Sequence, residues 1–220
     1  MSGDKLTPLQ WRILEVLSGI QPRWALTGGG ALAGFHLKHR LTKDLDLFWH
    51  GQDQLGDLPR EVRERLSAAG LEATVLQTAP AFFQLRVTDG TGVCTVDLVA
   101  DPVPPIEAPQ ELPLQRGSIT VDSPQEILVN KLCALLGRAE LRDLVDVKGL
   151  LDSGADLKRA LADAPRKDAG FSPLTLAWIL RDIRPKALGH LAGLSEEEAK
   201  NLEELKERLV LELLEAGAPE

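Results

Sequence analysis

The stretch LTGGGALAGFHLKHRLTKDLDL, residues 26–47, decides the fold. It predicts a short strand at 24–27, a sharp turn over three glycines, a helix at 31–37 and then a second strand. That second strand alternates polar and apolar residues from Asp44 onward. Side chains two apart on a strand lie on one face, so Asp44 and Asp46 are predicted to point the same way.

The chemistry of this stretch suits a nucleotide. Gly28, Gly29 and Gly30 let the backbone approach a phosphate, and N–H groups at the start of the next helix point at an anion. Two carboxylates on one strand face can hold Mg²⁺, which prefers carboxylate and phosphate oxygens. A glycine turn alone is more often only a turn, and an Asp-x-Asp pair alone is often solvated on an edge strand. The combination at this spacing is the informative signal.

Asp97 is the candidate for a third acid at the same site. It lies in the apolar segment Val-Asp-Leu-Val, residues 96–99, where a lone carboxylate is costly. A neighbouring strand would bring it beside the first two acids. Carboxylates this close would raise one another's pKa values, and bound cations are the expected remedy. Taken by itself, Asp97 could equally face solvent.

Patterns along the rest of the chain predict an α+β protein. A capping box at Thr7 with Pro8 begins the first helix, and Leu9, Ile13 and Leu17 form its apolar face. Beyond residue 47 we expect a helix at 58–69, strands at 73–76, 82–87, 93–99 and 118–121, a proline-rich loop at 101–113, and helices at 124–137, 139–152, 156–163, 173–183 and 195–216. The expected organisation is a mixed-sheet core over 1–120 with flanking helices, followed by a helical lobe over 121–220.

Composition narrows the classes of function. The 220 residues carry a formal net charge of −8, which argues against broad, nonspecific nucleic-acid binding. A local basic segment remains at 35–43, for which a phosphate-facing loop and a plain solvated loop are both open. No apolar run is long enough to span a membrane, and the N-terminus lacks the apolar core of a signal peptide. The isolated Cys94 and Cys133 fit a reducing cytoplasm.

Two separate motifs resemble the AbiEii and MenT-type toxins of the nucleotidyltransferase superfamily. The first comprises the turn Gly28-Gly29-Gly30-Ala31-Leu32 and the segment His39-Arg40-Leu41-Thr42-Lys43-Asp44-Leu45-Asp46. The second comprises Lys131-Leu132-Cys133-Ala134-Leu135-Leu136-Gly137-Arg138 and Arg142-Asp143-Leu144-Val145-Asp146. The resemblance covers residues 24–151, and no motif is recognised from 152 to 220.

The resemblance implies roles for individual residues. Asp44, Asp46 and Asp97 would be metal ligands and Lys131 would neutralise nucleotide phosphates, with Asp143 as a further essential acid. Arg40 and Thr42 would buttress the glycine turn or contact phosphate. Gly30 departs from the family pattern, in which Ser or Thr is frequent at this position. A side-chain hydroxyl that would contact the phosphate is therefore lost. Taken alone, the charges of the second motif could be exposed helix pairs, and His36 and His39 lack metal-ligand spacing.

The function implied is magnesium-dependent transfer of NMP from an NTP to an acceptor hydroxyl. The expected acceptor is RNA, such as a tRNA 3′ end, and the expected role is that of a cytoplasmic toxin or phage-defence component with a cognate antitoxin and no membrane partner. One alternative is a transferase acting on a protein or small-molecule hydroxyl. Another is a catalytically degenerate nucleotide-binding protein, for which Gly30 is the supporting feature.

Overall fold

The computed structural model describes residues 5–218, which form two compact units, one ending at Ser123 and one beginning at Pro124. Within the described residues, no helix is both long and apolar enough to cross a bilayer.

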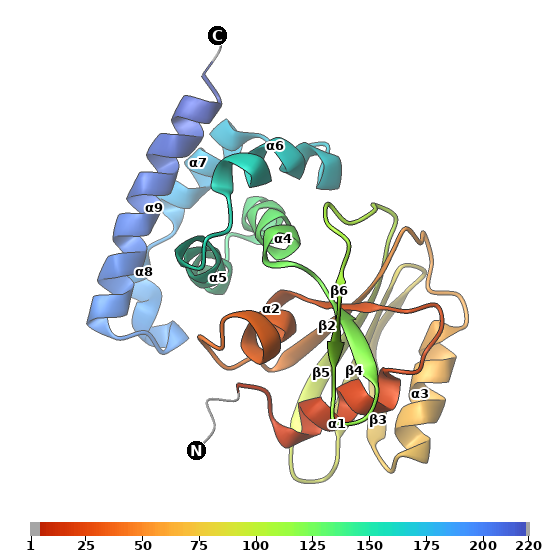
Figure 1. The fold of residues 1–220 in the computed structure, drawn as a ribbon. Helices are drawn as coiled ribbons and strands as arrows, with labels where there is room; N and C mark the ends of the chain where they lie inside the picture. The colour runs from red at the N-terminus through yellow and green to blue at the C-terminus, as the bar shows by residue number, and fades with distance from the viewer. Residues whose placement is uncertain (1–4, 219–220) are drawn as a thin grey trace. The chain divides into compact units, whose positions relative to one another are not determined.

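The first unit is built on a mixed sheet of seven strands within the described part of the chain (Figure 1). The strand order is β3-β4-β5-β2-β1-β7-β6. The strands are β1 (Ala25–Thr27), β2 (Asp44–His50), β3 (Glu72–Ala79), β4 (Phe82–Thr88), β5 (Val93–Asp101), β6 (Gln110–Pro113) and β7 (Ser118–Val121). The β2–β5 and β1–β7 pairs are parallel, and the other pairs are antiparallel.

Helices and strand alternation together build the core of this unit. The helical segments are α1 (Pro8–Leu17), α2 (Gly28–Ala31), a π-helical turn (Leu32–His36) and α3 (Leu58–Ala68). The capping box at Thr7 is present, and the apolar face expected for α1 is fully or almost fully buried. Strands β2 and β5 bury every second residue and leave the residues between them half-buried, except Val93 at the start of β5, which is exposed. This alternation confirms the strand predictions for both segments and leaves one face of the sheet available for polar side chains.

The second unit is entirely helical over its described residues. Its helices are α4 (Pro124–Arg138), α5 (Leu141–Asp152), α6 (Leu157–Lys167), α7 (Pro173–Asp182), α8 (Pro185–Leu188) and α9 (Glu196–Ala216), with a 3₁₀ turn at Gly189–Ala192. The long helix α9 lies alongside α7 and α8, while α4 packs against α5 and α6 (Figure 1). A second capping box, formed by Ser195 and Glu198, begins α9.

Two sequence-based expectations need correction. The glycines do not form a separate turn, because α2 begins directly at Gly28, whose φ of +58° lets the chain pass from strand to helix without a linker. The loop expected at 101–113 ends in strand β6, which pairs antiparallel with β7 from Gln110 to Pro113. A four-residue edge strand that ends in proline has too little alternation to be recognised from its sequence.

Candidate active site

The acids of the first motif lie at the start of β2. Asp44 and Asp46 are half-buried, whereas Leu45 and Leu47 between and after them are fully buried. Parallel pairing of β2 with β5 places Asp97 opposite Asp46. The expectation that a neighbouring strand brings Asp97 beside the first two acids is therefore confirmed. The three carboxylates occupy adjacent positions on one face of the sheet.

Strand β4 adds an amide to this face. Gln84 lies opposite Asp97 in the antiparallel pairing of β4 with β5. Its Nε2 donates a hydrogen bond of 2.9 Å to Asp97 Oδ1. This bond fixes the side chain of the third acid, and it could not be foreseen without knowing which strands are neighbours.

Gly28 connects the two halves of the motif. A Cβ built at this position would lie 2.4 Å from Asp46 Oδ2, far inside the normal contact distance. Gly28 also has a positive φ, a backbone conformation that residues other than glycine rarely adopt. Glycine is therefore needed here both for backbone conformation and to let the Asp46 carboxylate lie against the chain.

Gly29 and Gly30 face different surroundings. A Cβ at Gly29 would approach Thr42 Oγ1 at 3.0 Å and an Arg40 guanidinium nitrogen at 3.2 Å. A Cβ at Gly30 would instead meet the side-chain methyl groups of Leu26 and Leu45, each at 3.1 Å. A side chain at position 30 thus points into the apolar core. The expectation that Gly30 costs a phosphate-facing hydroxyl is corrected, because Gly30 serves close packing.

The segment before β2 buttresses the acids. The Thr42 hydroxyl lies 3.3 Å from the Asp44 carbonyl and 3.4 Å from the Asp44 nitrogen. Gln10 of α1 donates to the Thr42 carbonyl at 3.1 Å, and Arg40 donates to the Leu41 carbonyl at 3.1 Å. Of the two roles expected for Thr42, the contacts support buttressing of the chain between the glycines and the first acid.

Thr27 carries an unsatisfied hydroxyl at this site. It lies opposite Asp46 in the β1–β2 pairing and immediately precedes Gly28. The residue is 3% exposed, and its Oγ1 has no hydrogen-bond partner among the described residues. A buried polar group without a partner costs roughly 1–3 kcal/mol. A polar ligand bound beside Asp46 would supply the missing partner.

The second motif forms a buried ion network within the helical unit. Lys131 Nζ lies 2.8 Å from Asp143 Oδ1 and 2.7 Å from Asp146 Oδ2, and both acids are fully buried. Arg138 adds a two-point contact to Asp143, at 2.7 and 2.8 Å. Burial raises the pKa of Asp143, but the Arg138 hydrogen bonds and the Lys131 charge outweigh it, so the pKa is lowered overall. The interpretation of this motif as exposed helix pairs is wrong for Lys131 and the two acids.

Comparison with known proteins now decides the family. A family model described as "Nucleotidyl transferase AbiEii toxin, Type IV TA system" matches residues 12–217. The chain belongs to the AbiEii family. It is accordingly a nucleotidyltransferase, and the match extends past residue 151, where the recognised motifs end. Among curated proteins, none matches this sequence.

Two solved structures show that this AbiEii protein shares its fold with other nucleotidyltransferase-like chains. JHP933 from Helicobacter pylori is 19% identical with a TM-score of 0.54, over 93% of this chain and 90% of that one. A second H. pylori protein, described as a candidate nucleotidyltransferase, is 20% identical with a TM-score of 0.52, over 97% of this chain and all of that one. At these identities the likeness supports the mixed sheet with flanking helices and nothing finer.

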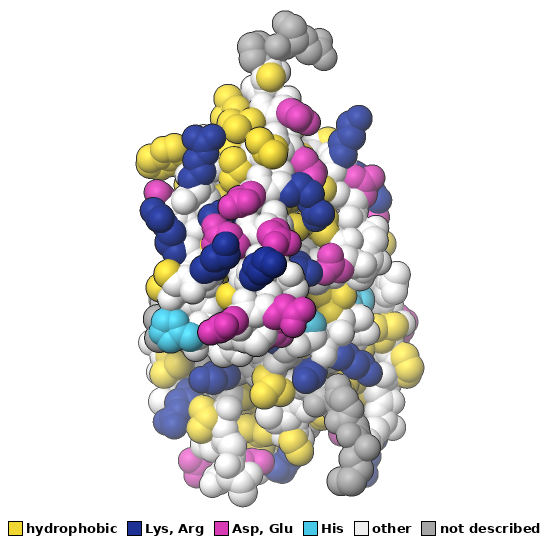
Figure 2. Space-filling view, turned by 90° about the vertical axis from the view of Figure 1, so that its left-hand side faces the viewer, with side chains coloured by type: hydrophobic (Ala, Val, Ile, Leu, Met, Phe, Trp, Pro, Cys, Tyr) yellow, Lys and Arg dark blue, Asp and Glu magenta, His cyan; other side chains and the backbone are white. Residues whose placement is uncertain are grey.

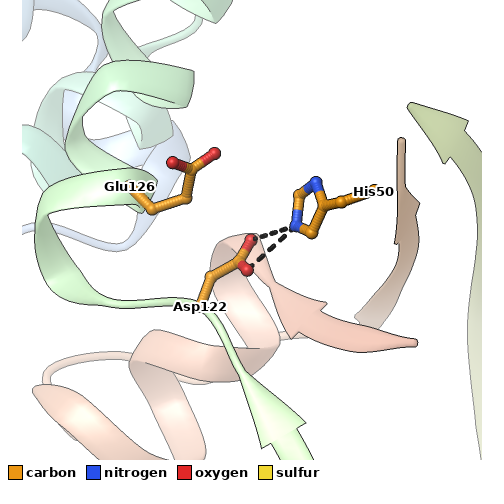
Figure 3. Close-up of side chains that lie close together, drawn as sticks. All are labelled: His50, Asp122 and Glu126. Atoms are coloured by element: carbon orange, nitrogen blue, oxygen red, sulfur yellow. Dashed lines mark hydrogen bonds and ion pairs between the residues drawn. The ribbon is translucent and has the colours of Figure 1, made fainter. Parts of the chain in front are cut away.

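The AbiEii chain also has a histidine with two carboxylate partners that the sequence did not reveal. His50 ends β2, and its Nε2 lies 3.0 Å from the fully buried carboxylate of Asp122 (Figure 3). Its Nδ1 lies 3.3 Å from Asp101 Oδ2. The His36 Nε2 donates to the Asp122 carbonyl at 2.8 Å, and burial lowers the pKa of that imidazole. His50 is an even number of residues from Asp44 and Asp46 along β2, so its side chain lies on the same face of the strand. This alternation was the sequence signal that could have identified His50 as a candidate site residue. Glu126, also drawn in Figure 3, belongs to the second unit and pairs there with Lys167.

Acidic residues outnumber basic residues in both units. Residues 1–123 contain 15 acidic and 11 basic residues, and residues 124–220 contain 18 and 14, so each unit has a formal charge of −4. Basic and acidic side chains are interspersed on the face over α8 and α9 (Figure 2). Several basic side chains of the helical unit pair with acids, as Arg159 and Arg166 do with Asp163. The net charge of each unit therefore gives no general attraction for a polyanion.

Proposed function

We propose that this AbiEii-family protein transfers NMP from an NTP to a hydroxyl of an RNA acceptor, such as a tRNA 3′ end. Its role would be that of the toxin of a cytoplasmic toxin–antitoxin pair. The observation that carries the proposal is that the Asp46 carboxylate occupies the space where a Cβ on Gly28 would lie, next to the paired positions Asp46 and Asp97. It joins a site for phosphate to a site for cations, which is the combination that this transfer needs.

The residues present fit Mg²⁺. The donor set consists of carboxylate oxygens on one sheet face, which is the ligand type that this cation prefers. We assign Asp44, Asp46 and Asp97 as the residues that hold it. When bound, Mg²⁺ would supply charge neutralisation to the triphosphate and to the leaving pyrophosphate.

The chain's own groups then position the reactants. Backbone N–H groups from Gly28 to Gly30 bind phosphate oxygens, and the hydroxyl of Thr27 donates to the same ligand. The acceptor hydroxyl oxygen bonds to the α-phosphorus as the bond to the β-phosphate oxygen breaks. Pyrophosphate leaves, and the hydroxyl proton passes to a site carboxylate. We assign Lys131 to neutralising phosphate and Asp143 to holding Lys131 in place, as their 2.8 Å contact supports.

The deciding experiment follows label from each α-labelled NTP in the presence of magnesium and bulk tRNA. We expect label on RNA with the wild-type protein and a loss of about 100- to 1,000-fold with Asp44→Asn, which preserves the shape of the side chain. Asp53→Asn is the matched control, since that acid lies outside the site. Transfer that survives in Asp44→Asn would refute the assignment of the acids.

A second candidate acceptor is a hydroxyl on a protein or a small molecule. The formal charge of −4 on each unit favours this candidate, because a negatively charged protein has no general electrostatic attraction for a polyanion such as RNA. Adding cell lysate and a panel of hydroxyl-bearing small molecules to the same assay separates the acceptors. Label on protein or on a small molecule, with none on RNA, would keep the site and replace the acceptor. The catalytically degenerate alternative predicts no transfer of any label.

A further inference from the structure

The acid-bearing face of the sheet continues onto β4 beyond Asp97. In β4 the less buried residues are Phe82, Gln84, Arg86 and Thr88, whereas the residues between them are buried. Pairing places Arg86 opposite Thr95, and Thr95 opposite Asp44. Neighbouring strands lie about 5 Å apart, so the Arg86 Cα is roughly 10 Å from that of Asp44 on the same face.

The guanidinium of Arg86 is not committed to another group. Arg86 is exposed, and its side chain makes no ion pair or hydrogen bond within residues 5–218. Its nearest same-face neighbours on β4 and β5 are the uncharged Gln84, Thr88 and Thr95. Other arginines of this unit do pair with acids, as Arg65 does with Glu61. Arg86 thus presents an exposed guanidinium on the sheet face that also carries Asp44, Asp46 and Asp97.

The geometry of in-line attack indicates which reactant lies on the Arg86 side of the site. The glycines that would hold the nucleotide phosphates follow β1, on one side of the acid pair of β2. In-line displacement requires the attacking hydroxyl on the side opposite the leaving pyrophosphate. Across the sheet that side is β5 and then β4. The acceptor therefore approaches over Asp97 and Gln84, and Arg86 is the adjacent same-face residue of β4, in register with Thr95 and Asp44.

We propose that Arg86 binds a phosphodiester of the acceptor strand beside the reacting hydroxyl. A planar guanidinium can contact two phosphate oxygens at once, and phosphate is the group it recognises best in this geometry. The acceptor is then a nucleic acid. The positive charge of Arg86 would repel a cationic small molecule and so disfavours it as the acceptor. The proposal rests on the transferase function proposed above, to which it adds an acceptor-positioning residue.

The test measures tRNA binding without nucleotide, at several salt concentrations, for wild type, Arg86→Ala and Arg86→Lys. Arg63→Ala is the matched control, because Arg63 is an exposed arginine of α3 without an ion pair and its loss changes the net charge equally. We expect Arg86→Ala to weaken binding about tenfold and to reduce the salt slope by about one, with Arg86→Lys in between. Arg63→Ala should leave both quantities within about twofold of wild type.

Transfer assays on the same proteins separate the two proposals. Arg86→Ala should raise KM for tRNA while KM for NTP and kcat stay near wild type. A rise in KM for NTP alone, or tRNA binding by Arg86→Ala equal to that of Arg63→Ala, would overturn the Arg86 assignment. A wild-type protein that transfers no label refutes the proposed function, and the binding measurement still decides the role of Arg86.

Discussion

Replacing Gly28 by alanine should disable the site through Asp46. Alanine at a φ of +58° costs about 1–2 kcal/mol, because left-handed backbone is strained for a residue with a Cβ. The added Cβ would lie 2.4 Å from Asp46 Oδ2, and ordinary contact begins at 3.4 Å, so the carboxylate must move about 1 Å. A misplacement of this size at a reacting centre costs about 100-fold in rate. We therefore expect kcat/KM for NMP transfer to fall about 100-fold, with weaker Mg²⁺ binding in calorimetry.

Gly56→Ala provides the control for the backbone cost. Gly56 has a φ of +54°, and its Cβ would meet nothing within 4 Å. Both variants should lose about 1–2 kcal/mol of stability and melt a few degrees lower, but only Gly28→Ala should lose activity and Mg²⁺ affinity. Equal kcat/KM and equal Mg²⁺ affinity in the two variants would refute the argument that Gly28 positions Asp46.

Three further measurements test other features. Thr27→Val removes a buried, unsatisfied hydroxyl, so urea unfolding should show unchanged or slightly greater stability while nucleotide affinity falls about tenfold; lower stability with unchanged affinity would contradict this. Arg138 holds the pKa of Asp143 below its usual value against the effect of burial. Ionised Asp143 therefore contributes its full stabilisation of the folded state at pH values above its unfolded-state pKa of 3.8. That contribution is lost as the pH falls through the lower folded value, so urea melts between pH 2 and 6 should be less pH-dependent for Asp143→Asn than for wild type. Burial raises the pKa of Cys94 to about 12 and of Cys133 to about 11, so a thiol reagent at pH 8 should modify the native protein slowly and the unfolded protein fast.

Local patterns predicted the elements of the acid site correctly. Alternation with a period of two identifies β2 and β5 and orients Asp44, Asp46 and Asp97 on them, because side-chain direction on a strand is a property of neighbouring residues. The spacing from the glycines to Asp44 is likewise contained in the sequence. Asp97 was expected on a strand next to the first two acids, and the pairing of β2 with β5 confirms this and adds the register, with Asp97 opposite Asp46.

Other features depended on strand order and could not be derived in this way. Gln84 and Arg86 join the face only because β4 pairs with β5 in one particular register, and a shift by one residue would turn both side chains to the core. His50 and Asp122 come from segments 72 residues apart. The core-facing direction of Gly30 depends on where Leu45 lies after folding. Each of these required tertiary structure, which periodicity does not encode.

The buried network around Lys131 bears on how this site can be dissected. Lys131→Ala would leave Asp143 and Asp146 buried without their lysine, and removing one partner of a buried ion pair costs about 3–5 kcal/mol. Loss of activity in that variant would therefore follow from damage to the helical unit as readily as from a lost phosphate contact. The half-buried Asp44 on an open strand face carries no such penalty, because its neighbours Leu45 and Leu47 keep the core intact. Variants of the sheet acids consequently test the chemistry, whereas a role for Lys131 requires the charge-preserving Lys131→Arg, with stability measured in parallel.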